Sequence, residues 1–92
     1  MNKSTNYKLL KKIINEEDPL GLIDFDTPES LEEYEPELKE ILKKDISNFS
    51  SEELGEWIYQ VFVTFFNEEL ANGKDKYDSI AKKFLSAVKN ES

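Results

Sequence analysis

Residues 49–70, FSSEELGEWIYQVFVTFFNEEL, contain the clearest helical signal in the chain and decide its fold class. Ser50 and Glu53 have the spacing of a capping box, in which each side chain accepts a hydrogen bond from the other residue's backbone N–H. The apolar residues that follow recur at helical spacing on one face: Leu54, Trp57, Ile58, Val61, Phe62, Phe65 and Phe66. We therefore expect a central helix over residues 51–70, with this aromatic stripe forming core and not a ligand-binding box.

Helical periodicity predicts three further helices around the central one. Residues 76–89 carry an apolar stripe behind a capping position at Asp75, and residues 5–15 are amphipathic. A helix over residues 36–46 begins at Pro36, because proline is tolerated only in the first turn. No segment alternates as a strand would. The sequence thus predicts an all-α fold, a compact four-helix single domain over residues 1–92, with a long acidic connection between the first and second helices.

The composition limits the chemistry that the chain can perform. Its 92 residues include no cysteine and no histidine, so thiolate and imidazole metal ligands and the commonest general base are missing. We therefore expect no enzyme activity, no catalytic residues, no cofactor and no metal site.

The net charge indicates what kind of partner the chain would bind. A net charge of −8 disfavours nucleic acid and anionic membranes as partners and favours a basic protein. No run of residues is apolar enough for a signal peptide or a membrane span. We expect a cytoplasmic protein and a monomer.

The negative charge is concentrated between the first two expected helices. Residues 16–37, EEDPLGLIDFDTPESLEEYEPE, contain ten acidic residues and no Lys or Arg. Asp18-Pro19 stops the first helix, and Thr27-Pro28 predicts a short helical turn. A calcium-binding EF-hand is excluded, because Pro28 and Glu29 occupy the positions of a ligand and of the required turn glycine. Six apolar side chains lie among the acids: Leu20, Leu22, Ile23, Phe25, Leu31 and Tyr34.

Two interpretations of this segment remain. In the first, the segment is a solubilising loop whose apolar side chains pack against the helices. In the second, it is a protein-binding surface. In the second case carboxylates attract a basic partner while an apolar anchor supplies desolvated contact.

Several short motifs resemble a known family. Four motifs resemble a small all-helical bacterial domain of unknown function (DUF1871-like), typified by short Bacillus proteins. They are Asp18-Pro19-Leu20-Gly21 after an amphipathic helix, EEYEPELKEIL over residues 32–42, SSEEL from residue 50 and SIAKKFL over residues 79–85. The resemblance covers about residues 7–88 and implies a compact multihelical fold without established catalytic residues. The chain is also similar to immunity proteins of polymorphic toxin and contact-dependent growth inhibition systems. That similarity implies a toxin partner, frequently a nuclease with a basic cleft.

The leading hypothesis is therefore an immunity protein that binds and neutralises a cognate toxin nuclease, most simply a ribonuclease, through its acidic surface. The alternatives are a bacterial adaptor or regulator that binds a basic cellular protein through the same surface, and a DNA mimic. Asp18 either contributes to that surface or only shapes the Asp-Pro turn. Phe25 and Tyr34 are the expected anchors if they are exposed. The electrostatic contacts are expected from six carboxylates: Asp24, Asp26, Glu29, Glu32, Glu33 and Glu35.

Overall fold

The structure, a computed structural model, describes residues 3–24, 26–71 and 73–91. Five α-helices form its frame: α1 (Lys3–Glu17), α2 (Glu35–Ile41), α3 (Ser51–Phe65), α4 (Glu68–Ala71) and α5 (Lys74–Glu91). Two 3-10 helices, η1 (Pro28–Glu32) and η2 (Ile46–Asn48), lie in the connections before and after α2. No strand occurs in these described ranges, so the all-α class is confirmed, although they form five α-helices and not the expected four.

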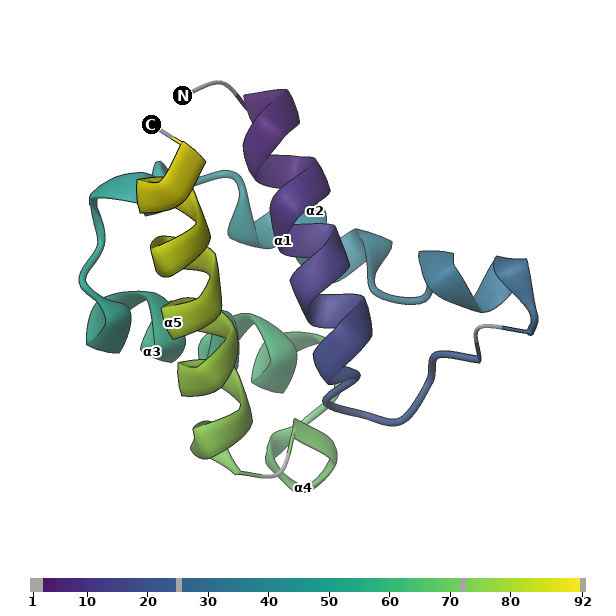
Figure 1. The fold of residues 1–92 in the computed structure, drawn as a ribbon. Helices are drawn as coiled ribbons and strands as arrows, with labels where there is room; N and C mark the ends of the chain where they lie inside the picture. The colour runs from purple at the N-terminus through teal and green to yellow at the C-terminus, as the bar shows by residue number, and fades with distance from the viewer. Residues whose placement is uncertain (1–2, 25, 72, 92) are drawn as a thin grey trace.

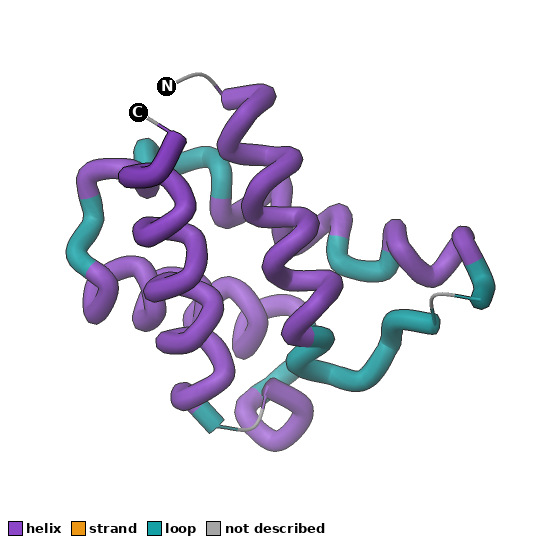
Figure 2. Tube along the Cα trace, viewed as in Figure 1, coloured by secondary structure: helices purple, strands orange, loops and turns teal. Residues whose placement is uncertain are grey.

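The helices pack around α3. This helix contacts α5, α2 and α4, while α1 contacts α5 and α2. Figure 1 shows α1 and α5 side by side at the front, with α2 and α3 behind them, and Figure 2 shows the same arrangement of helices and loops. The radius of gyration is 12.4 Å, which is close to the value of about 13 Å for a compact chain of about 100 residues.

Aromatic rings fill the centre of the core. The ring of Phe62 on α3 lies 5.0 Å from that of Tyr77 on α5 and 5.8 Å from that of Tyr34, with distances measured between centroids. All three side chains are fully buried. The Tyr77 hydroxyl donates a hydrogen bond to the carbonyl oxygen of Ala71 at 2.6 Å, so this buried polar atom is satisfied.

Gly55 allows α3 and α5 to approach closely. A Cβ atom at this position would lie 2.2 Å from Oδ1 and 3.2 Å from Cα of Asp78 on α5. Since the second of these atoms belongs to the backbone, a larger residue would push the two helices apart.

The start of α3 is as predicted, but its end is not. Ser50 is the N-cap, and both hydrogen bonds of the capping box with Glu53 are present. The expected helix over 51–70 breaks after Phe65, because Asn67 adopts a φ of 150°. The Oδ1 atom of Asn67 then accepts the N–H of Leu70 at 2.8 Å, so the chain begins the separate short helix α4.

The remaining helix boundaries differ from the predictions by a few residues. Helix α2 begins at Glu35, one residue before the predicted start, and ends at Ile41 instead of near 46, where Trp57 Nε1 donates to the Ile41 carbonyl oxygen at 3.0 Å. Helix α5 begins at Lys74, which places the expected cap Asp75 inside its first turn.

Candidate functional site

The connection between α1 and α2, residues 18–34, begins with a turn built on Asp18. This residue has a φ of 45°, in the left-handed region, and its carboxylate accepts the backbone N–H of Leu22 at 2.7 Å and of Ile23 at 3.2 Å. Lys76 of α5 donates to the Pro19 carbonyl oxygen at 3.0 Å. Asp18 therefore fixes the backbone of the turn. Of the two roles that the sequence allowed for Asp18, this is the structural one.

Tyr34 closes the other end of the connection and is completely buried. Its hydroxyl donates to Asp18 Oδ1 at 2.6 Å and accepts the Leu20 N–H at 3.1 Å. Burial, together with the hydrogen bond to Asp18, raises the pKa of the phenol. The expected role of Tyr34 as an exposed anchor is wrong, because its ring packs on Phe62 in the core. Phe25, the other expected anchor, lies outside the described residues.

The middle of the connection is a compact turn around Ser30. The Ser30 hydroxyl accepts the Asp24 N–H at 2.7 Å and lies 2.8 Å and 2.9 Å from the carbonyl oxygens of Asp24 and Thr27. The Asp24 carboxylate accepts the Asp26 N–H at 2.9 Å and the Thr27 hydroxyl at 3.1 Å. Thr27 precedes η1, so the predicted helical turn is confirmed, although its side chain makes no capping bond.

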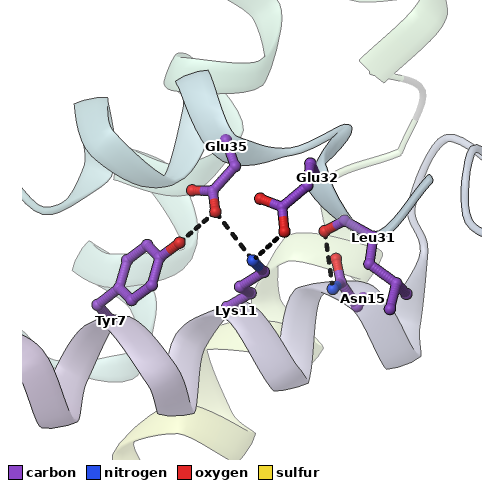
Figure 3. Close-up of polar contacts among 6 residues, drawn as sticks. All are labelled: Tyr7, Lys11, Asn15, Leu31, Glu32 and Glu35. Carbon is purple, nitrogen blue, oxygen red and sulfur yellow. Dashed lines mark hydrogen bonds and ion pairs between the residues drawn. The ribbon is translucent and has the colours of Figure 1, made fainter. Parts of the chain in front are cut away.

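Lys11 of α1 ties the connection to the bundle (Figure 3). Its ammonium group lies 2.9 Å from a carboxylate oxygen of Glu35 and 3.0 Å from one of Glu32. Tyr7 donates a hydrogen bond to the same Glu35 oxygen. Asn15, one turn further along α1, donates to the Leu31 carbonyl oxygen at 3.2 Å.

This ion pair changes the protonation equilibria of its members. Burial of Glu35 acts to raise its pKa, but the hydrogen bonds from Tyr7 and Lys11 outweigh that effect and hold the pKa below its usual value. The hydrogen bond to Glu35 raises the pKa of Lys11. Only 18% of the Glu35 side chain is exposed, so this residue holds the connection to α1 through its ion pair with Lys11. The Glu32 side chain, in contrast, is 61% exposed.

The structure thus sorts the eight predicted contact residues. Tyr34 and Glu35 hold the fold, Phe25 is not described, and Asp24 is exposed but shapes the local turn. The four carboxylates left to face a partner are Asp26, Glu29, Glu32 and Glu33, all exposed. Figure 1 shows this connection extending away from the packed helices.

Sequence reasoning missed two exposed apolar side chains outside the connection. Phe65 was expected in the core, yet 45% of it is exposed. Leu70, on α4, is 56% exposed. The spacing of Phe65 matches that of the buried stripe, so periodicity within α3 does not distinguish it from the buried members.

Within the described ranges no group of three or more acidic side chains is arranged to hold a metal ion. None of the helices described is long and apolar enough to cross a membrane. Comparisons of the chain with protein-family models, with curated proteins and with solved structures found no match.

Proposed function

We propose that the protein is an immunity protein that binds a basic toxin domain, a nuclease of the ribonuclease class, and neutralises it. The observation that carries the proposal is the set of exposed carboxylates Asp26, Glu29, Glu32 and Glu33 on one projecting connection. Residues 18–34 contain six acidic residues and no basic one.

The described ends of the connection are also fixed to the rest of the protein, which favours recognition of a folded partner. Asp18 and Tyr34 join its two ends, and Lys11 fixes its last part to α1. A surface that is ordered before binding loses less conformational entropy when the complex forms. Carboxylates on such a surface increase the association rate with a basic partner by roughly ten- to a thousandfold at low salt.

A nuclease cleft is a natural target for this surface. It must attract phosphate groups and therefore carries a positive potential, which an acidic protein can occupy or cover. The absence of cysteine and histidine from the sequence suits a protein that acts by binding and does not react with its partner.

The test is co-expression with the toxin domain encoded beside this gene, with growth as the readout. Asp26→Lys combined with Glu29→Lys should abolish protection and weaken binding by about tenfold or more at low salt. The matched control is Glu16→Lys with Glu52→Lys, which changes the net charge equally at exposed positions outside the connection.

Full protection by the Asp26→Lys/Glu29→Lys variant would contradict the acidic-surface proposal. A gene with no toxin neighbour would favour the adaptor alternative. Glu35 is unsuitable for this test, because its reversal would break the ion pair with Lys11 and disturb the fold.

A further inference from the structure

The outer face of α1 carries lysines without an ion-pair partner in the described part of the chain. Lys8 and Lys12 are one turn apart and exposed, and neither belongs to an ion pair there. Together with Thr5 and the half-buried Leu9, they line an open hollow of about 270 Å³. The first fifteen residues contain four lysines and no acidic residue, so this face is basic along most of its length.

The acidic connection adjoins this basic face. Lys11, the residue before Lys12, pairs with Glu32 at 3.0 Å. Asn15, one turn further along α1, donates to the Leu31 carbonyl oxygen at 3.2 Å. Figure 3 shows Glu32 and Leu31 beside these α1 side chains. A strip of exposed lysines and a strip of exposed carboxylates therefore lie next to one another on the surface.

The carboxylates furthest from α1 have no cation to bind. Asp26 and Glu29 are exposed, and their side chains make no hydrogen bond or ion pair within the described ranges. Glu32, nearer to α1, shows that a carboxylate of this connection can pair with a lysine of that helix. The surface thus offers two lysines and two carboxylates, each without a partner of the opposite charge.

The uneven distribution of charge matters more than its total. Helices α1 and α5, which lie side by side in Figure 1, carry nine lysines and five acidic residues. All other parts of the chain carry three lysines and fifteen acidic residues. The molecule therefore has a basic side and an acidic side, although its net charge is −8.

The net charge by itself favours a monomer, because two such molecules repel one another. That repulsion acts between centres at least about 20 Å apart, since the shortest dimension of the molecule is 20 Å. At physiological ionic strength the Debye length is about 8 Å, so repulsion over this distance is largely screened, whereas ion pairs in direct contact are screened less.

Adjoining strips of opposite charge are complementary to themselves under a two-fold rotation. Such a rotation places the basic strip of each molecule on the acidic strip of the other, so every contact occurs twice. The contact is closed, because both strips of both molecules are then occupied.

We propose that the outer face of α1 binds the acidic connection of a second copy of this chain, in a two-fold symmetric dimer. Lys8 and Lys12 of each copy meet Asp26 and Glu29 of the other. Exposed ion pairs contribute little individually, so the dimer is weak, with a dissociation constant (Kd) of about 10 µM to 1 mM. A consequence that rests on the proposed function is that the toxin and the second copy compete for the connection.

Sedimentation velocity of the whole chain tests the dimer without any toxin. The protein is measured from about 10 µM to about 1 mM, in about 0.02 M and about 0.3 M sodium chloride. We expect a monomer–dimer equilibrium at low salt, with a Kd that rises at least fivefold at high salt, because attraction between the strips is screened. Association that strengthens with salt would overturn the proposal, since it would show that the repulsive net charge dominates.

Charge reversal of either strip should disrupt the dimer. Lys8→Glu combined with Lys12→Glu should raise its Kd at least tenfold. The matched control is Lys39→Glu with Lys82→Glu, which changes the net charge equally at two exposed lysines that belong to no ion pair in the described ranges. An equal loss of dimer in the control would show that net charge, and not the α1 face, is responsible.

Reversal of the acidic strip should have the same effect. Asp26→Lys with Glu29→Lys should also raise the Kd at least tenfold, whereas Glu52→Lys with Glu69→Lys, at exposed positions outside the connection, should not. Circular dichroism and the Tm of each variant establish that the fold is retained.

A mixture of the two interface variants gives the sharpest result. Lys8→Glu/Lys12→Glu has two acidic strips and Asp26→Lys/Glu29→Lys has two basic ones, so each should be monomeric alone and the two should form a heterodimer when mixed. Together they carry the same total charge as two wild-type molecules, so a change in total charge cannot explain restored association. Failure of the mixture to associate would overturn the pairing of these strips.

Other outcomes assign the surface differently. Species larger than a dimer would show that the strips meet head to tail, which contradicts the two-fold arrangement. A monomer at all concentrations would reject the dimer. If that monomer also bound labelled single-stranded RNA, and Lys8→Glu/Lys12→Glu abolished the binding, the α1 face would belong to nucleic acid.

The co-expression assay separates this proposal from the proposed function. Lys8→Glu/Lys12→Glu should keep full protection, because it leaves the carboxylates of the connection intact. A wild-type monomer, with protection lost in Asp26→Lys/Glu29→Lys, would reject the dimer and retain the immunity function. A dimer disrupted by Asp26→Lys/Glu29→Lys, with full protection by that variant, would retain the dimer and reject the acidic surface as the toxin-binding site.

Discussion

Removing the hydroxyl of Tyr34 should destabilise the fold by about 2–3 kcal/mol. Tyr34→Phe keeps the ring against Phe62 but deletes the bond donated to Asp18 at 2.6 Å and the bond accepted from the Leu20 N–H at 3.1 Å. A hydrogen bond to a charged group contributes about 1.5–3 kcal/mol, and an N–H left without an acceptor costs about 1 kcal/mol or more. Although the Tyr34 ring is buried, the two hydrogen bonds of its hydroxyl are only partly buried, so the lower part of this combined range applies.

The assay is urea unfolding followed by Trp57 fluorescence and far-ultraviolet circular dichroism, together with thermal unfolding. For a chain of this size the loss corresponds to a fall in Tm of about 10–20 °C. The control is Tyr59→Phe, whose hydroxyl has no hydrogen-bond partner in the described part of the chain and which should change stability by less than about 0.5 kcal/mol. A loss below about 0.5 kcal/mol for Tyr34→Phe as well would refute the claim that this hydroxyl closes the connection.

Three further predictions concern helix packing and pH. Gly55→Ala should destabilise the protein by about 1 kcal/mol in urea unfolding, because overpacking against Asp78 costs about 1–3 kcal/mol while the gain in helix propensity is about 1 kcal/mol; a net gain in stability would contradict the close contact. The pKa of Glu35 lies below its ordinary value of 4.5, so its contribution to stability is present above that pH and is lost as the pH falls. Lys11→Met should therefore flatten the acid side of the stability–pH profile, and an unchanged profile would argue against the ion pair. The pKa of Glu37 is raised from 4.5, so the folded state binds more protons and stability falls as the pH rises through this range. Glu37→Gln should accordingly stabilise the free protein at pH 7 and lose that advantage in acid, and destabilisation at pH 7 would show that the buried charge is satisfied.

Local signals in the sequence predicted helix starts well. The capping box of Ser50 and Glu53 placed the start of α3 at the observed residue, and Thr27 marked the turn that becomes η1. Asn67 followed by two glutamates is itself a helix-start signal, so the division between α3 and α4 was present in the sequence. The apolar periodicity continues through Asn67, and it therefore favoured one uninterrupted helix over residues 51–70.

The burial of Tyr34 could not be predicted from its neighbours. Acidic residues flank it on both sides, which is typical of an exposed position. Contacts with Asp18 and Phe62, 16 and 28 positions away in the sequence, place the ring in the core. The pairing of Lys11 with Glu35 spans 24 positions in the sequence, and periodicity within one helix carries no information about it.

Phe65 illustrates the opposite error. Its helical spacing matched that of the buried stripe, but α2 has 7 residues and α3 has 15. At about 1.5 Å per residue, the shorter helix covers only about half of the longer one. Which apolar side chains remain accessible therefore depends on the lengths of the neighbouring helices.

Different residues of the connection stabilise the fold and face a partner protein. This separation affects how the choice of partner can change during evolution. Asp18, Tyr34 and Lys11 fix its two ends through bonds to residues outside its exposed tip. Asp26 and Glu29 are exposed and make no side-chain hydrogen bond or ion pair within the described residues. Their identities can therefore diverge with little effect on folding, so related molecules could acquire different partners through substitutions at these positions while sharing one scaffold.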